Sequence, residues 1–378
     1  MRNKKILYVR SGPYKVNLNS YNLQEVGFSK SLCDKGFSCD ILYYSNFNKD
    51  EEIYSNNNCK VRILWRKGIK ILRTGIYPQI LNKKFLSRYD LIIATEYSQI
   101  MTILMSKLSN NVVIYNGPYY NLFKIKFIEK IYDKLFVNVI NKNIKQVFVK
   151  SDLAKEYLIK KGIKNISVLG VGLDISKFEL DNKPSNKINK LIEFMKKNKC
   201  LLYVGSLDDR KNFRFTLKVF EKVNNINPDI KLVVIGKGKR GYVENCFKEI
   251  KNETKKNIIH INELDNNYLK FVYKEADIFV LPSKLEIFGM VLLEAMYFGV
   301  PTITSVNGGS STLIKNNING IIMNNFDENN WCNNILNLIN NKDLSEKIKE
   351  NSKNTIKNNF NWNSISSLFL NNLDLGRK

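Results

Sequence analysis

The sequence predicts an α/β protein with two doubly wound domains, and three observations lead to this fold class. Short runs of β-branched or aromatic residues alternate with longer helical patterns along the chain, which indicates βαβ units and mainly parallel sheets. The chain has 378 residues, which is long for a single hydrophobic core. A polar segment near the middle separates two sets of elements. This favours two domains over the alternative, a closed eight-stranded barrel.

Strands are expected in both halves of the chain. In the first half they cover Ile6–Arg10, Asp40–Tyr44, Leu91–Ala94, Val112–Tyr115 and Gln146–Lys150. In the second half they cover Leu201–Gly205, Lys231–Gly236, Ile258–Ile261, Ile278–Leu281 and Thr302–Thr304. A helix is expected from about Gly289 to Phe298, after the fourth strand of the second half.

The domain boundary is expected at residues 179–199, a polar, lysine-rich segment that contains a proline. The N-terminal domain is therefore predicted at residues 1–178 and the C-terminal domain at 200–359, with 179–199 as a linker. Residues 360–378 are predicted to form a last helix.

The segment from Pro282 to Gly309 is the most informative part of the chain. It carries Glu286 and Glu294 on either side of a Phe288-Gly289 step, between an apolar strand and the predicted helix. A helix that begins at the end of a strand binds anions readily, because its first backbone N–H groups lack partners within the helix. Carboxylates beside it accept hydrogen bonds from sugar hydroxyls, so the combination fits a nucleotide-sugar. The alternative is an ordinary βα unit with a solvated acid.

An earlier loop carries two adjacent cations. The strand that ends at Gly205 and Ser206 runs into a charged turn with Arg210 and Lys211. An arginine fork and a lysine point charge both suit a diphosphate, and a charged surface turn is the alternative.

The next two strands end in weaker candidates. Gly236 begins a Gly-x-Gly turn, which allows a ligand to approach the backbone closely but also suits a plain tight turn. Leu264 follows the next strand, whose His260 is the single histidine of the chain and is interpreted as structural.

These motifs resemble the donor site of the retaining, GT-B-fold glycosyltransferases of family 4. The matching residues are Pro282-Ser283, Glu286, Phe288-Gly289, Glu294-Ala295-Met296, Gly299-Val300-Pro301 and Gly308-Gly309. The resemblance implies two Rossmann-like domains that face each other across a cleft. It also implies a last helix that packs back on the N-terminal domain.

The resemblance assigns a role to each candidate of the donor site. Arg210 and Lys211 are implied to hold the diphosphate, Glu286 the hydroxyls of the transferred sugar, and Glu294 the ribose. Arg210, Lys211 and Glu286 are the expected catalytic residues, and no metal ligand is expected. The expected donor-binding residues are Gly205, Ser206, Gly236, Leu264, Phe288, Gly289, Met290 and Glu294.

The N-terminal domain resembles the family less closely. Gly12 follows the first strand, and Tyr21 opens a helix that resembles the acceptor-side helix of polysaccharide-building relatives. Asn116 lies in the stretch where many members carry a histidine, and either Asn116 or a backbone carbonyl is expected to supply the hydrogen bond there. Gly12, Tyr21 and Asn116 are the expected acceptor-side residues. Glu96 is a further candidate, with an ordinary surface acid as the alternative.

The formal net charge is +25, and residues 60–88 contain nine basic and no acidic side chains. Such a field attracts nucleic acid, phospholipid headgroups or pyrophosphate-linked substrates. Residues 123–145 interleave apolar side chains with lysines, which fits a helix on a membrane surface or a domain helix with a solvated lysine face. No apolar run reaches the roughly 20 residues of a membrane span, and the first apolar run is too short for a signal peptide.

We therefore expect a retaining, metal-independent hexosyltransferase that needs no cofactor. It would transfer a sugar from a UDP- or GDP-sugar donor to a glycan or polyprenyl-pyrophosphate-linked acceptor, in bacterial surface-polysaccharide or lipopolysaccharide synthesis. We expect it in the cytoplasm, peripheral on the anionic inner face of the plasma membrane, without nucleic acid as a partner. The alternatives are a GT-B-fold nucleotide-sugar epimerase and a basic nucleic-acid-binding protein, whose phosphate partner the paired glutamates would repel.

Overall fold

The computed structural model describes residues 4–18, 23–71, 73–123, 125–179 and 183–375. The chain forms two compact units. Unit 1 comprises Met1–Gly172 together with Asn361–Lys378, and unit 2 comprises Leu173–Phe360.

The sheet of unit 1 has eight strands within the described residues, in the order β10-β9-β8-β7-β1-β2-β4-β3. All neighbouring strands are parallel except β3, which pairs antiparallel with β4. The bounds are β1 (Lys4–Val9), β2 (Phe37–Ser45), β3 (Lys49–Asn56), β4 (Cys59–Lys67), β7 (Leu91–Thr95), β8 (Val112–Asn116), β9 (Val147–Val149) and β10 (Ile166–Val168). A separate antiparallel hairpin is formed by β5 (Ile69–Ile71) and β6 (Thr74–Ile76).

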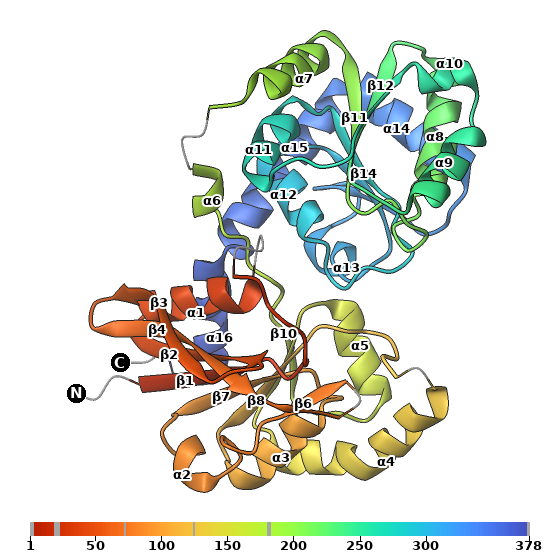
Figure 1. Cartoon of the computed structure of the whole chain (residues 1–378). Helices are drawn as coiled ribbons and strands as arrows, with labels where there is room; N and C mark the ends of the chain where they lie inside the picture. Colours follow the sequence, from red (N-terminus) through yellow and green to blue (C-terminus); the bar gives the residue numbers. More distant parts are fainter. Residues whose placement is uncertain (1–3, 19–22, 72, 124, 180–182, 376–378) are drawn as a thin grey trace. The chain divides into compact units, whose positions relative to one another are not determined.

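Helices cover both faces of this sheet (Figure 1). One face carries α1 (Gln24–Asp34) and α16 (Trp362–Asn372). The other face carries α2 (Lys83–Leu86), α3 (Ile100–Leu108), α4 (Lys126–Asn143) and α5 (Asp152–Lys160). None of the helices in the described ranges combines the length and the hydrophobicity that crossing a membrane requires.

The last helix completes the core of unit 1 through aromatic side chains. Phe369 of α16 packs edge-on against Phe28 of α1, with ring centroids 5.1 Å apart, and lies 4.8 Å from the ring of Phe148. Trp362 fits against Gly27, where an added Cβ would lie 2.2 Å from the indole nitrogen. Residues from the end of the chain therefore pack in the same buried layer as α1 and β9.

Unit 2 has a six-stranded sheet among its described residues, in the order β13-β12-β11-β14-β15-β16, with every pair parallel. This order is that of a doubly wound Rossmann sheet. The bounds are β11 (Lys199–Val204), β12 (Ile230–Ile235), β13 (Ile258–Ile261), β14 (Ile278–Leu281), β15 (Thr302–Ser305) and β16 (Ile321–Met323).

The helices of unit 2 lie on both faces of its sheet. Their bounds are α6 (Ser176–Glu179), α7 (Asn186–Lys197), α8 (Phe213–Ile226), α9 (Arg240–Lys248), α10 (Asn252–Lys255), α11 (Asn266–Glu275), α12 (Met290–Phe298), α13 (Ser310–Leu313), α14 (Glu328–Asn340) and α15 (Lys342–Asn359). Side chains of α8, α9 and α14 share one buried cluster with the strands, in which Trp331 is fully buried.

The segment expected as a linker, 179–199, is different in the structure. Its described part includes the last residue of α6, the whole of α7 and the first residue of β11. Ile188, Leu191 and Met195 recur at helical spacing and are buried, so this lysine-rich segment has an apolar face that packs within unit 2.

We predict that Phe369→Ala destabilises unit 1 by about 3–5 kcal/mol, because the change removes a buried aromatic ring and leaves a cavity. Urea unfolding followed by circular dichroism measures the difference. Leu368→Ala is the matched control, since its side chain is 44% exposed on the same helix. Equal effects of the two changes would contradict the role of α16 in this core.

Candidate functional site

The unit 2 sheet has a topological switch point between β11 and β14, where the strand order reverses. In open parallel sheets, ligands bind outside the carboxyl ends of the strands at such a point. Two loops leave the sheet there, residues 205–212 after β11 and residues 282–289 after β14. Arg210, Lys211 and Glu286, the three predicted catalytic residues, lie on these loops.

The structure brings these three charged side chains together. Lys211 forms an ion pair through its Nζ with Oε2 of Glu286. Nη1 of Arg210 lies 3.4 Å from the same oxygen and donates a hydrogen bond of 3.1 Å to the carbonyl of Leu285. Lys211 is buried, whereas about half of the Arg210 side chain is exposed. Two cations therefore share the carboxylate of Glu286, and both can bind an anionic ligand.

Hydrogen bonds within the first loop fix the position of Lys211. Oδ1 of Asp208 accepts from the backbone N–H of Lys211 at 2.7 Å, and Oδ2 accepts from the Ser206 hydroxyl at 2.7 Å. The Tyr203 hydroxyl donates to the carbonyl of Ser206 at 2.9 Å, and burial raises the pKa of Tyr203, so it stays protonated. The sequence analysis missed Asp208, although an Asp that bonds the backbone further along a turn is a known signal.

The second loop is fastened to the first. The backbone N–H of Lys284 donates to the carbonyl of Arg210 at 2.9 Å, and the Lys284 ammonium pairs with Asp209 at 2.8 Å. Glu286 is therefore held opposite Lys211 by backbone as well as by charge.

Glycines let the backbones of neighbouring loops approach one another. A Cβ at Gly236 would lie 1.8 Å from the carbonyl oxygen of Gly205, and Gly236 has a φ of +151°. In the same way, a Cβ at Gly309 would lie 1.8 Å from the carbonyl oxygen of Phe288. The predicted donor-binding residues Gly205, Gly236 and Phe288 therefore have a packing role in the structure.

Helix α12 begins beside the charged cluster. Gly289 precedes it with a φ of +76°, and a Cβ there would lie 3.1 Å from Cγ of Glu286. Met290 is the first residue of the helix and is half-buried. The start of this nine-residue helix adds a partial positive charge next to Lys211 and Glu286.

Glu294 lies further along α12 and is only 1% exposed. One of its carboxylate oxygens, Oε2, accepts a hydrogen bond of 2.9 Å from the Tyr273 hydroxyl on α11. This bond orients the carboxylate, and the assignment of Glu294 to a ribose stays a prediction.

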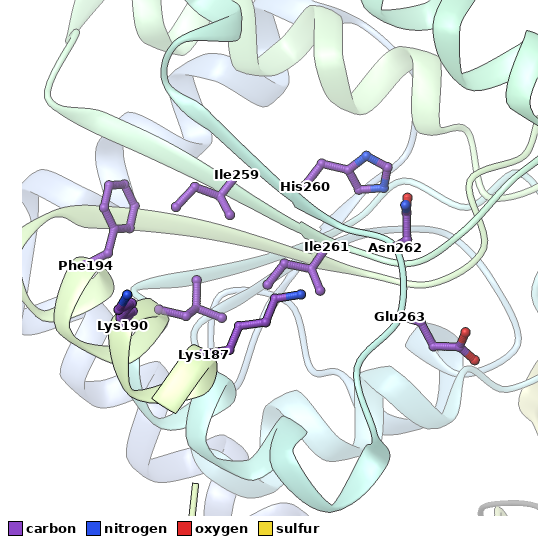
Figure 2. Close-up of a pocket in the computed structure, with 9 residues that line it drawn as sticks. Lys187, Lys190, Phe194, Ile259, His260, Ile261, Asn262 and Glu263 are labelled. Carbon is purple, nitrogen blue, oxygen red and sulfur yellow. The ribbon is translucent and has the colours of Figure 1, made fainter. Parts of the chain in front are cut away.

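A separate pocket of about 660 Å³ lies between α7 and the edge strand β13. Figure 2 shows Lys187 and Phe194 on the side of the strand to which Ile259 and Ile261 point, with the ring of His260 on the other side. Nε2 of His260 lies 2.9 Å from the carbonyl oxygen of Gly236, which fits its structural interpretation.

That pocket is distinct from the switch point. None of the predicted donor-binding residues lines it. Leu264 lies three residues after the end of β13 and is half-buried.

The predicted acceptor-side residues receive less support from the structure. Gly12 lies in the loop after β1, and Tyr21 is outside the described residues. Asn116 is fully buried: its Oδ1 accepts from the backbone of Tyr97 at 3.2 Å, and its Nδ2 donates to the carbonyl of Pro118 at 2.9 Å. The amide of Asn116 therefore holds the loops after β7 and β8, because buried backbone groups at strand ends need partners.

Other polar groups gather at the carboxyl end of the unit 1 sheet. Glu96, after β7, has a φ of +61° and accepts from Gln99 at 3.1 Å. Arg10, at the end of β1, forms an ion pair of 2.8 Å with Glu25, and the sequence analysis missed both residues. Burial lowers the pKa of Lys150, which donates to Gln24 of α1. Within the described residues, no group of three or more His, Cys, Asp and Glu side chains is arranged to hold a metal ion.

Comparison with known proteins shows what most of unit 2 is similar to. Residues 185–355 match the family model described as glycosyl transferases group 1. This part of the chain is therefore similar to group 1 glycosyltransferases. The matched segment contains the whole charged cluster and the start of α12.

Curated proteins similar to this chain include bacterial surface-polysaccharide enzymes. The capsular polysaccharide biosynthesis glycosyltransferase CapM of Staphylococcus aureus is 28% identical over 242 residues, which cover 61% of this chain and 60% of CapM. The UDP-Gal:alpha-D-GlcNAc-diphosphoundecaprenol alpha-1,3-galactosyltransferase of Escherichia coli is 27% identical over 201 residues, which cover 52% of this chain and 50% of that enzyme. The chain thus spans about half the length of the curated relatives that it matches.

Solved structures confirm the predicted GT-B fold class. HepE of Anabaena, solved in complex with UDP, has a TM-score of 0.73 at 16% identity and covers 98% of this chain and 99% of its own. Sucrose-phosphate synthase of Thermosynechococcus elongatus has a TM-score of 0.70 at 18% identity, with 98% of each chain covered. At this level of identity the likeness concerns the fold.

We predict that Gly236→Ala destabilises unit 2 by about 1–3 kcal/mol, since its methyl group would overlap the Gly205 carbonyl. Urea unfolding gives the free energy. Gly241→Ala in α9 serves as the control, because a Cβ there meets nothing within 4 Å. A Gly236→Ala protein as stable as the control variant would contradict the close approach of the two loops.

Proposed function

We propose that this protein is a glycosyltransferase that moves a sugar from a nucleotide-sugar to a hydroxyl of a glycan or lipid-linked acceptor, with retention at the anomeric carbon. The observation that carries the proposal is the meeting of Arg210, Lys211 and Glu286 at the switch point, beside the start of α12. A diphosphate needs cations and N–H donors, and a sugar needs hydrogen-bond acceptors. This cluster offers both within a few ångströms.

In the proposed reaction, the donor diphosphate replaces Glu286 as the partner of Lys211. Arg210 already reaches the surface, so it meets the incoming anion first. Glu286 is then free to accept hydrogen bonds from the sugar hydroxyls. Lys211 and Arg210 stabilise the charge that grows on the leaving diphosphate, which lowers the barrier.

The bond changes can be balanced without a further reactant. The bond between the anomeric carbon and the diphosphate oxygen breaks, and a bond from the acceptor oxygen to that carbon forms on the same face. The acceptor proton passes to the departing phosphate oxygen. In this scheme the two cations and the helix start supply the charge stabilisation, and no metal is required.

We further propose that the acceptor belongs to bacterial surface-polysaccharide or lipopolysaccharide synthesis and that the protein works at the anionic inner face of the plasma membrane. Relatives named for capsular and lipopolysaccharide synthesis support this choice. The Escherichia coli relative is named for a UDP-sugar and a diphosphoundecaprenol acceptor, which makes a UDP-sugar and a polyprenyl-linked acceptor the first to test.

Transfer of radiolabelled sugar tests the proposed function directly. UDP-, GDP- and ADP-sugars are incubated with the protein and bacterial lipid extracts, and calorimetry measures nucleotide binding in parallel. We expect one donor to label a lipid or glycan product. The absence of both nucleotide binding and transfer for all donors would contradict the proposal.

We predict that Lys211→Ala lowers kcat/KM for transfer by about 10²–10³-fold, the loss typical of removing one preorganised group that stabilises transition-state charge. Lys218→Ala, on the surface of α8, is the control and should keep full activity. Transfer at the native rate by the Lys211→Ala protein would show that this side chain takes no part in the mechanism.

We predict that Glu294→Ala weakens UDP binding by about 1–3 kcal/mol, because the ribose hydroxyls lose a buried acceptor. Calorimetry of the native and variant proteins with UDP and with 2′,3′-dideoxy-UDP separates this role from an effect on folding. The native protein should prefer UDP, whereas the variant should bind both ligands alike. An unchanged preference in the variant would mean that Glu294 serves only the bond with Tyr273.

A further inference from the structure

Helix α4 of unit 1 presents an apolar stripe to solvent. Phe127, Ile131 and Leu135 are 67%, 43% and 58% exposed. They are spaced four residues apart and so share one face of the helix. Scattered exposed apolar residues are common, but a continuous stripe of large ones marks an interaction surface.

The hairpin β5–β6 extends this stripe. Ile69 and Ile71 of β5 are 57% and 44% exposed. A groove of about 160 Å³ is lined by Ile71 of the hairpin and by Ile131 and Leu135 of α4, so the two elements are neighbours. We call the surface formed by Ile69, Ile71, Phe127, Ile131 and Leu135 the α4–β5 face.

Charges on α4 are segregated around the stripe. Lys130 and Lys134 are exposed, and at about 100° per residue both lie on one side of Phe127, the side away from Ile131 and Leu135. The acids of this helix, Glu129 and Asp133, point elsewhere, because both pair with Lys161, at 3.0 and 2.6 Å. The stripe of α4 therefore has positive charge along one edge.

The basic block at residues 60–88 contributes less free charge than its sequence indicates. Three of its side chains are paired with acids of β2 and β3, namely Lys60 with Glu52, Arg62 with Asp40 and Arg66 with Asp50. The expected attraction of this block for anionic surfaces is thus partly cancelled within unit 1. Lys130 and Lys134 of α4 form no ion pair with an acid among the described residues, so they are better placed for such an attraction.

We propose that the α4–β5 face docks on an anionic phospholipid bilayer. The apolar side chains would enter the boundary between headgroups and acyl chains, while Lys130 and Lys134 meet the phosphates. Charge complementarity favours a membrane of this kind over a neutral surface. The choice of a membrane also rests on the proposed function, in which the acceptor is lipid-linked.

Vesicle flotation tests this docking face. The full chain is mixed with phosphatidylcholine vesicles, with or without phosphatidylglycerol, at low and high salt. We expect binding to the anionic vesicles at low salt, and about tenfold weaker partition for Phe127→Asp and for the double change Lys130→Glu and Lys134→Glu. Ile226→Asp is the control, since Ile226 is 64% exposed on unit 2 and should bind as the native protein does.

Two results would overturn the proposal. One is a native protein that does not float with anionic vesicles; if it also forms a dimer in sedimentation that Phe127→Asp abolishes, the face binds a second copy. The other is a native protein that floats with anionic vesicles and whose binding is weakened by neither set of substitutions on α4. UDP binding, measured on the same samples, separates this failure from a failure of the proposed function, because the switch-point residues lie in unit 2.

Discussion

The arrangement of the candidate site depends on one interaction, the ion pair between Lys211 and Glu286 that Arg210 flanks. The two residues are 75 positions apart in the chain. They meet because β11 and β14 are hydrogen-bonded neighbours in the sheet, so the loops that leave their carboxyl ends emerge side by side. A buried carboxylate without a cation is costly, and so is a buried ammonium without an anion. Each charge therefore requires the other until an anionic ligand replaces Glu286 as the partner of Lys211.

Backbone packing makes this meeting point rigid. Strand order brings the loops together, and glycines at the ends of β11 and β12 and after β15 let their backbones touch. The charged groups need little rearrangement before they meet a ligand, which is the preorganisation that electrostatic catalysis requires. Glycines also allow close packing in unit 1. Those beside Trp362 leave room for its side chain, so that α16 packs against the N-terminal segments.

Much of the fold could be predicted from the sequence, because buried parallel strands appear as continuous apolar runs. Ile258–Ile261 and Ile278–Leu281 have the predicted bounds. The hairpin of β3 and β4 was missed, since β3 is polar and has no buried side chain, and the turn places Asn57 and Asn58 at positive φ. Helix α7 was taken for a linker because its lysines outnumber its buried apolar residues. For the site, the motif identified the charged residues, but pairings such as Tyr273 with Glu294 join distant segments that spacing cannot connect.

The central claim is that a nucleotide-sugar diphosphate takes the place of Glu286 beside Lys211. A crystal structure of the protein soaked with a UDP-sugar measures this directly. The account predicts diphosphate oxygens within hydrogen-bond distance of Arg210 and Lys211, with Glu286 turned to the sugar hydroxyls. A diphosphate bound elsewhere, such as in the pocket between α7 and β13, with the pair of Lys211 and Glu286 still intact, would contradict it.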